Sequence, residues 1–458
     1  MGHGTSETLF LPSYTDDRPP GPDLPAYRPE RSEQADPAPS LVGQKGEKEC
    51  SYTMMKGGHS FLVMNLISAV PNSQSMPIFF EGSPVKGKVQ LHLKKKDPIS
   101  TIVLSVQGVL LVGGGNAHGN LDGYSTVFLN HKHTVWAQEE QKNRVALNGD
   151  HTWPFSIDLP PEVEMIEGVH PKKFRLPRTF HQPFGSATIK YEIAVQVVRK
   201  GFLRLNDQLV APIVFIPIVA PPPLLPLRRL AYEQGATIPG PKADPEGWHL
   251  QKAVSIECAL FDGHSARAEC RLFLAKPLSY STGSVIPLFI TFESDDRQLL
   301  HLLSSPQATT VRVRRHIICS SEAHKAAVES KLNSSKAWRN HIDYSQRAVW
   351  WHAEDRPAQG SSDLTTALSG ELHLKPDMVP TTSIVNFRVN YSVVIFPFNT
   401  PGFKVEGRSL LLEQPITIVT SFAPGPRPRM LTPADYTPDI KNDADELQTN
   451  GEFSNGFY

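Results

Sequence analysis

Apolar and polar side chains alternate with a period of two along much of the middle of the chain. In one such run the apolar positions share a single face: Ile189, Tyr191, Ile193, Val195 and Val197. The same alternation recurs between Val385 and Ile395. A period of two is typical of a β-strand with one buried face. Further strands are predicted at 89–93, 102–112, 254–260, 285–292 and 416–422, so the core is expected to be almost entirely β.

One segment departs from this pattern. Residues 321–338 are rich in Ala, Glu, Lys and Leu, and serines precede Glu322 where they can cap a helix, so a short helix is predicted. The segment lies in an insertion near 321–367, which also holds the adjacent Trp350 and Trp351. We expect these two tryptophans to serve local packing.

Several features of the first half recur in order in the second half, at a spacing of about 200 residues. Gly82-Ser83 and Gly283-Ser284 each open a strand, and the strand with Tyr191 is echoed by the strand with Tyr391. Between them, residues 176–179 (LPRT) are echoed by residues 379–382 (VPTT). The repeat predicts two domains of the same sandwich topology.

The length and the proline distribution predict how these domains are bounded. A chain of 458 residues exceeds what one core usually holds, and its 41 prolines collect at the two ends and near the middle. We expect five regions: a disordered arm at 1–51, a β-sandwich at 52–220, a Pro-rich linker at 221–247, a second β-sandwich at 248–423, and a disordered acidic tail at 424–458.

Composition narrows the class of protein. Lys plus Arg balance Asp plus Glu at 46 each, which gives no indication of nucleic-acid binding. The four cysteines show no C-x-x-C spacing and are expected to be reduced and buried. The first residues lack a basic and an apolar region typical of a secretory signal, and prolines interrupt the apolar run 210–227. We therefore expect a cytoplasmic protein without a membrane span.

No pattern of catalytic residues stands out. The glycine-rich run 113–119 lacks the Gly-Lys-Ser/Thr ending of a phosphate loop and is interpreted as a hairpin connection. His131 and His133 share a strand face, with His118 and His151 as candidate neighbours, but no cysteine or carboxylate completes a metal set. We expect no enzymatic activity, no cofactor and no metal site.

Taken together, these residues resemble the arrestin-like family, especially the fungal arrestin-related trafficking adaptors (alpha-arrestins). In the first half the resemblance lies in 79–89 (FFEGSPVKGKV), 102–108, 155–160 and Leu176-Pro177 leading to Tyr191; in the second half it lies in 278–294, 379–381 and 389–395. It implies two consecutive immunoglobulin-like antiparallel β-sandwiches, the arrestin fold. The long interdomain stretch and the insertion near 321–367 depart from the family pattern.

The sharpest functional signal lies in the N-terminal arm, where the pattern L-P-x-Y occurs twice. The residues concerned are Leu11, Pro12 and Tyr14, then Leu24, Pro25 and Tyr27. The pattern is similar to the PY motif read by WW domains, by which HECT-type ubiquitin ligases capture such adaptors. Proline presets a polyproline II backbone for an aromatic groove, and two copies on one flexible chain gain avidity.

The resemblance implies an adaptor that links a membrane transporter or receptor cargo to a WW-domain HECT ubiquitin ligase for ubiquitin-dependent endocytosis, at the plasma membrane or endosomes. An alternative is a ubiquitin-independent scaffold of a retromer-like sorting coat. A secreted carbohydrate-binding sandwich that exposes Trp350 and Trp351 is disfavoured by the missing signal. Basic clusters occur at 94–96, 172–173, 228–229 and 312–315, and they are either solvated faces or contacts to anionic lipid or an acidic cargo tail. The sequence does not decide whether phosphorylation acts at Thr432-Pro433 or Thr437-Pro438.

Overall fold

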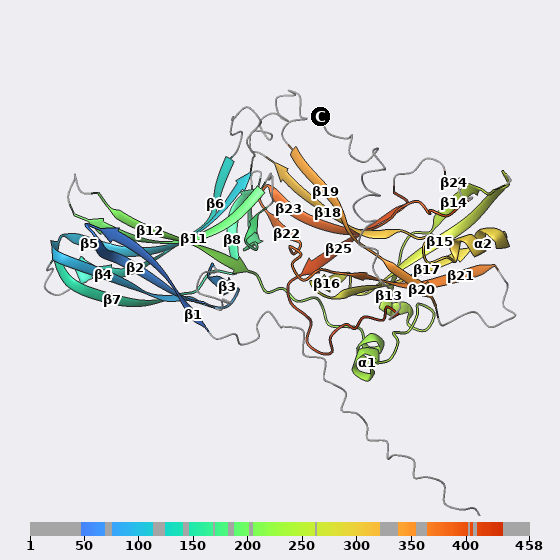
Figure 1. Ribbon diagram of the computed structural model, residues 1–458, viewed down its shortest axis with the longest axis horizontal. Helices are drawn as coiled ribbons and strands as arrows, with labels where there is room; N and C mark the ends of the chain where they lie inside the picture. Colours follow the sequence, from blue (N-terminus) through green and yellow to red (C-terminus); the bar gives the residue numbers. More distant parts are fainter. Residues whose placement is uncertain are drawn as a thin grey trace, which may run out of the picture. The chain divides into compact units, whose positions relative to one another are not determined.

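The computed structural model describes residues 47–68, 76–112, 124–140, 146–167, 170–181, 187–200, 205–261, 263–320, 338–353, 364–401, 404–405 and 410–433. Strands make up nearly all of the regular structure in these ranges (Figure 1). The expected all-β fold class is therefore confirmed. Most of the expected N-terminal arm, and the tail beyond Pro433, lie outside the described residues.

The first sandwich packs a four-stranded sheet against a larger one. The smaller sheet has the order β1 (Lys48–Lys56), β2 (His59–Ser68), β4 (Val85–Asp97), β7 (Leu147–Ile157). The larger sheet has the order β3 (Ile78–Phe80), β12 (Asp207–Ile216), β11 (Ala187–Arg199), β5 (Ile99–Val112), β6 (Tyr124–Ala137), and β10 (Phe180–His181) also pairs with β11. A separate hairpin joins β8 (Glu162–Glu167) to β9 (His170–Arg175), and a 3₁₀ turn, η1 (Gln138–Glu140), follows β6.

The second sandwich repeats this arrangement with extra strands. One sheet has the order β20 (Val349–His352), β21 (Thr365–His373), β17 (Val285–Glu293), β15 (Ser265–Ala275), β14 (Val254–Ala259), β24 (Lys404–Val405), and β13 (Trp248–Leu250) also pairs with β15. The other has the order β16 (Ser279–Ser281), β25 (Leu412–Val419), β23 (Phe387–Ile395), β18 (Val311–Ser320), β19 (Trp338–Arg347), and β22 (Thr382–Ile384) pairs with β23. A short helix, α2 (Arg297–Leu303), follows β17.

The alternation predicted for residues 189–197 is confirmed in β11. Its predicted apolar positions are at most 1% exposed, whereas Lys190 and Glu192 point to the other face and form an ion pair of 2.8 Å. β11 lies between β5 and β12, with Val106 opposite Ile193. Its apolar face therefore belongs to the core, and burial of each large aliphatic side chain contributes about 1.5–3 kcal/mol.

The predicted internal repeat is visible as two equivalent corners. Tyr191 Oη donates to the carbonyl of Pro177 at 2.7 Å, and Tyr391 Oη donates to the carbonyl of Val379 at 2.7 Å. Each corner also has a short parallel strand pair, β3 with β12 and β16 with β25. The sequence comparison placed Pro177 opposite Pro380, but the hydrogen bonds show that Pro177 is equivalent to Val379, one residue earlier. The structural equivalence is set by the tyrosine-to-carbonyl bonds, which cannot be read from the sequence.

The turns that open β4 and β17 are equivalent as well. Gly82 and Gly283 adopt φ angles of +77° and +74°, which residues with a Cβ rarely adopt. Ser83 N donates to Phe80 O at 3.0 Å, and Ser284 N donates to Ser281 O at 3.2 Å. Glycine is thus needed in both turns because the backbone is left-handed there.

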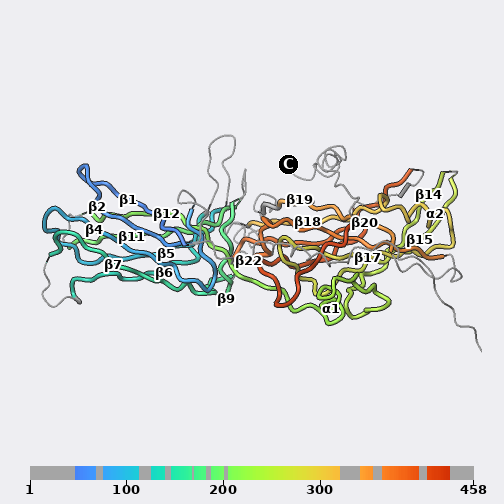
Figure 2. The backbone as a smooth tube through the Cα atoms, turned by 60° about the horizontal axis from the view of Figure 1, so that its bottom comes forward, coloured from blue at the N-terminus to red at the C-terminus, as the bar shows by residue number. Residues whose placement is uncertain are grey.

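The stretch expected to be a stiff linker, 221–247, contains regular structure that the sequence analysis did not predict. Helix α1 (Pro226–Gln234) begins with a proline, which is tolerated in a first helical turn, and ends at Gly235 in the left-handed conformation. A 3₁₀ turn, η2 (Pro245–Gly247), follows, capped by Asp244. α1 lies beside the C-terminal red segment in both views of the chain (Figures 1 and 2).

The insertion and the tail also differ from expectation where they are described. The helix predicted at 321–338 falls outside the described residues except for Trp338, which begins β19. Most of the rest of the described insertion forms the edge strands β19 and β20, so it extends both sheets. The tail was expected to be solvated from Pro424, but residues 424–433 pack against the second sandwich, because Leu431 and Thr432 hydrogen-bond to the buried Glu371.

Candidate functional site

The residues with the clearest sequence signal lie outside the described part of the chain. This holds for both L-P-x-Y motifs, Leu11, Pro12 and Tyr14 with Leu24, Pro25 and Tyr27, and for the glycine-rich run 113–119 with His118. Their predicted roles stay predictions.

The other candidate metal ligands are held by neighbouring strands. His131 and His133 lie on β6, and His151 lies on β7. The His151 ring stacks on Trp153 with centroids 5.5 Å apart, and its Nε2 donates to Asn148 O at 3.0 Å. Within the described ranges, no three His, Cys, Asp or Glu side chains form a group suited to a metal ion. His151 therefore has a structural role within β7: its ring packs on Trp153 and it bonds to the backbone of Asn148.

The four cysteines and Trp350 behave as the sequence predicted. All four cysteines are free and buried, and burial raises the pKa of the Cys270 thiol, which keeps it protonated and unreactive. Trp350 is 6% exposed and its ring covers Gly370 on the adjacent strand β21. A ring placed in this way packs the core face of the sheet and is not a ligand platform.

Most basic clusters are neutralised by neighbouring carboxylates. Arg315 pairs with Asp343 at 2.7 Å, Lys172 with Glu167 at 2.8 Å, and Arg229 with Glu233 at 2.8 Å. Lys94, Lys95 and Lys96 are exposed at a register shift between β4 and β7, and no ion pair to them occurs among the described residues. Of the clusters noted in the sequence, this one remains available for an acidic partner.

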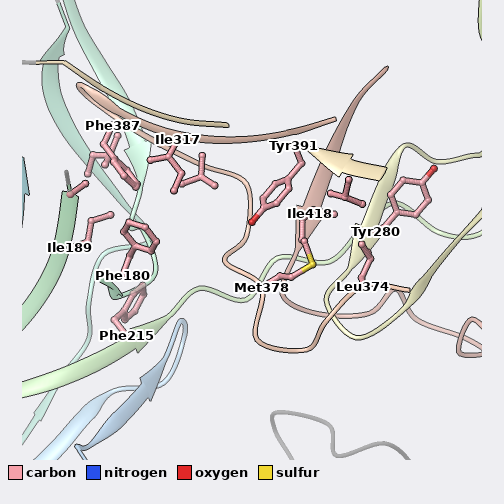
Figure 3. Packing of buried hydrophobic residues seen from close by; sticks show 14 of the residues in the cluster. Phe180, Ile189, Phe215, Tyr280, Ile317, Leu374, Met378, Phe387, Tyr391 and Ile418 are labelled. Carbon is pink, nitrogen blue, oxygen red and sulfur yellow. The ribbon is translucent and has the colours of Figure 1, made fainter. Parts of the chain in front are cut away.

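Residues of both sandwiches meet at a junction next to the two corners. Arg178 donates through Nη1 to the carbonyl of Met378 at 3.2 Å, and the rings of Phe180 and Phe387 lie with centroids 5.4 Å apart (Figure 3). At the rim, Arg388 pairs with Glu167 at 2.9 Å. Burial lowers the pKa of Arg178, opposed by the nearby Asp377 carboxylate. The junction therefore combines an aromatic contact with directional bonds.

The segment that leaves the first sandwich after β12 is hydrogen-bonded to both sandwiches. Ile218 N donates to Glu81 Oε2 at 2.8 Å, a carboxylate that also pairs with Arg175. One step later, Val219 N donates to Thr420 Oγ1 at 2.9 Å. The exit of β12 is thus fixed by one side chain from each sandwich.

Beyond this exit, the chain covers the outer face of β17. Trp248 packs on Phe289, with centroids 6.2 Å apart, and the Arg228 guanidinium lies 5.2 Å from the Trp248 ring. Arg228 is 3% exposed and donates to the carbonyls of Lys276 and Gly247. Helix α1 is therefore anchored to the sheet by a buried cation bonded to backbone oxygens.

A small cavity of about 40 Å³ lies between α1, the sheet and the C-terminal residues. Half of its lining residues are prolines or aromatic residues, among them Pro221, Tyr232, Tyr280, Phe422 and Pro426. Burial raises the pKa of Tyr232 to about 12, so its hydroxyl is neutral at physiological pH. The lining suits proline-rich backbone better than a charged ligand.

We call residues 424–433 the C-terminal strap. Pro426 and Pro428 line the cavity, and Arg427 lies 3.9 Å from the Phe422 ring centroid. Further along, Leu431 N and Thr432 Oγ1 donate to the carboxylate of Glu371, at 2.7 and 2.8 Å. The strap is thus held at both of its halves.

The covering of this sheet was missed in the sequence analysis, although a signal existed. Val285, Ile286, Pro287 and Leu288 are four consecutive buried positions in β17, and a continuous apolar run is typical of a strand covered on both faces. The position of Glu371 gave no such signal, because its partners lie 60 residues away in a segment without periodicity.

Comparison with known proteins agrees with the fold. Residues 70–210 match the family model of the N-terminal domain of arrestin (or S-antigen). A search of curated proteins gave no match. In the described ranges, no helix is both long and apolar enough to span a bilayer. The matched residues coincide with most of the first sandwich, and the second sandwich repeats its corners, so the matched domain and the all-β architecture support an arrestin-like fold.

Proposed function

We propose that this protein is an arrestin-related adaptor that links membrane cargo proteins to a WW-domain HECT ubiquitin ligase for ubiquitin-dependent endocytosis. The observation that carries the proposal is the pair of L-P-x-Y motifs in a chain that contains an arrestin N-terminal domain. The protein itself transfers nothing in this mechanism: it brings the ligase and the cargo together.

The chemistry of the two L-P-x-Y motifs supports their proposed role in binding WW domains. Each motif offers a proline-preset backbone to an aromatic groove and a tyrosine ring to a neighbouring pocket. Tyr14 and Tyr27 are separated by about a dozen residues of polar, proline-containing chain. Binding of one motif raises the effective concentration of the other at a second WW domain.

We assign the peripheral contact with an anionic membrane surface to the first sandwich. Lys94, Lys95 and Lys96 carry three adjacent exposed charges, and Lys86 adds a fourth on the outer face of the same strand. Each lysine near an anionic surface contributes about 1 kcal/mol at physiological salt, which is enough for reversible recruitment beside a cargo protein.

A reconstituted ubiquitylation reaction tests the proposal. The full chain is incubated with activating and conjugating enzymes and a HECT ligase with tandem WW domains, and it is compared with the Tyr14→Ala, Tyr27→Ala variant. We expect the intact chain to be modified and the variant to be modified at least about tenfold more slowly. The matched control is Pro19→Ala, Pro20→Ala, which changes the arm between the motifs.

Purification from cells separates this function from the retromer-like scaffold. A stoichiometric complex that survives washing, contains no ligase and is unchanged by the tyrosine substitutions would contradict the adaptor and support the scaffold. Weak recovery of a HECT ligase that is lost with the two tyrosines is the expected result.

A further inference from the structure

Glu371 is the most deeply buried carboxylate of the second sandwich among the described residues, at 1% exposure. It lies on the outer face of β21, opposite Val349 on one side and Pro287 on the other. Its oxygens accept hydrogen bonds from Leu431 N at 2.7 Å and Thr432 Oγ1 at 2.8 Å, and His373 Nε2 lies 3.2 Å away. The partners of this carboxylate thus come largely from the strap.

This arrangement makes the strap and Glu371 depend on each other. An ionised carboxylate out of water needs hydrogen-bond donors, and donors to a charged acceptor form stronger bonds than neutral pairs do. His373 also lies 2.9 Å from Thr432 Oγ1, so the hydroxyl is bonded on two sides. Thr432 is therefore the residue through which the strap is fixed most tightly to the sheet.

The residue after Thr432 is Pro433, which is exposed. A threonine followed by proline is the pattern that proline-directed kinases recognise. We propose that Thr432 is a phosphorylation site and that its modification releases the C-terminal strap from the second sandwich. The kinase transfers the γ-phosphoryl group of ATP to Thr432 Oγ1, and ADP and the hydroxyl proton leave.

Electrostatic repulsion prevents the strap from staying bound when Thr432 is phosphorylated. In the unmodified protein the Thr432 hydroxyl donates a hydrogen bond to Glu371. Phosphorylation removes this donor and adds a group with a charge of about −1.5 to −2, whose oxygens act as acceptors. Three acceptor oxygens would then face a buried acceptor at the same distance. His373 is 39% exposed and carries at most one positive charge, and among the described residues neither arginine nor lysine hydrogen-bonds to Thr432 or Glu371. The phosphate can be accommodated only when the strap has left.

Release has a defined structural consequence. Pro426 and Pro428 form part of the cavity wall, together with Tyr232 and Tyr280. When they leave, the small cavity becomes an open groove lined by prolines and aromatic rings. The modification site therefore controls access to a surface of the second sandwich, independently of the L-P-x-Y motifs.

Hydrogen exchange and trypsin cleavage of the full chain test the proposal. The protein, with Thr437→Ala to remove the neighbouring Thr-Pro pair, is phosphorylated by a proline-directed kinase, and the site is mapped by mass spectrometry. We expect exchange of the Leu431 amide and cleavage after Arg429 to rise about tenfold or more, because the bonds to a charged acceptor are lost. The unphosphorylated protein is the reference.

Two variants separate charge repulsion from simple loss of a bond. Thr432→Val keeps the shape of the side chain, cannot be modified, and is expected to raise exchange by less than phosphorylation does. Glu371→Gln keeps an acceptor for Leu431 N but removes the negative charge. In that background, phosphorylation of Thr432 is expected to raise exchange several-fold less than in the parent protein.

Either of two results would overturn the proposal. One is exchange and cleavage that are unchanged when Thr432 is fully phosphorylated. The other is a kinase that modifies a peptide spanning residues 426–438 but leaves Thr432 of the intact protein unmodified even after prolonged incubation.

Discussion

Each sandwich contains one of two equivalent strands, β4 and β17, yet the outer faces of these strands differ. β4 presents Lys86, Lys88, Gln90 and His92 away from the core. At the corresponding places β17 has Pro287 and Phe289, which α1, Trp248 and the C-terminal strap cover. The cores are alike because both sheets must bury one face. The outer faces are free to diverge, so one sandwich exposes charge and the other holds the end of the chain.

At the junction, too, equivalent positions of the two sandwiches carry different side chains. Tyr191 and Tyr391 are equivalent, and four residues before each lie Ala187 and Phe387. Phe387 is 0% exposed and contacts Phe180 of the other sandwich. Only the second sandwich has a large ring at this position.

The largest expected effect comes from removing that ring. Phe387→Ala should lower the free energy of unfolding by about 3–5 kcal/mol, because it leaves a cavity in a fully buried site. Ala187→Gly, at the equivalent position, should cost only about 1 kcal/mol. Urea unfolding followed by tryptophan fluorescence measures both. Equal effects would mean that the ring does not link the sandwiches.

Glycines opposite edge-strand rings give the next effect. Gly370 faces Trp350 and Gly108 faces Phe128, and a Cβ at either position would overlap the ring. Gly370→Ala and Gly108→Ala are each expected to cost about 1–3 kcal/mol through overpacking. Thermal unfolding measures both variants. An unchanged melting temperature in either variant would mean that the neighbouring ring moves aside without cost.

The two corner tyrosines should give a smaller and matched effect. Tyr191→Phe and Tyr391→Phe each remove one hydroxyl bond of 2.7 Å to a carbonyl. Each should lower the free energy of unfolding by about 1 kcal/mol, and the double variant should lose the sum, because separate corners are independent. Denaturant titration measures this. A tyrosine without effect would show that its corner is held by packing alone.

The smallest effect is expected at the rim of the junction. The hydrogen bond from Lys172 lowers the pKa of Glu167, burial opposes this, and Arg388 adds to the lowering. A lowered folded pKa contributes stability above the unfolded value of about 4.3, and this contribution is lost as the pH falls through the folded pKa. Arg388→Gln should cost less than about 0.5 kcal/mol at neutral pH and nothing below the folded pKa. Unfolding curves at several pH values test this, and a pH-independent cost would contradict the ion-pair origin.

The core of the fold was predictable because period-two alternation reports which face of a strand is buried. Tyr191 and Tyr391 were found as a repeat for the same reason. Helix α1 was missed, since prolines are frequent in the linker around it and only three of its residues are buried. The continuous apolar run of β17 indicated that both of its faces are covered. The sequence did not indicate which segments cover the outer face, because contacts such as Leu431 with Glu371 join residues 60 positions apart. The L-P-x-Y motifs are short linear sequence patterns, so they could be recognised without knowledge of the fold.

The most direct test of the adaptor function is calorimetric titration of the full chain with tandem WW domains of a HECT ligase, beside the Tyr14→Ala, Tyr27→Ala variant. We expect micromolar or tighter binding, about −8 kcal/mol, that disappears in the variant. Absence of binding by the intact chain, or equal binding by the variant, would contradict the ligase connection and leave the arrestin-like fold without it.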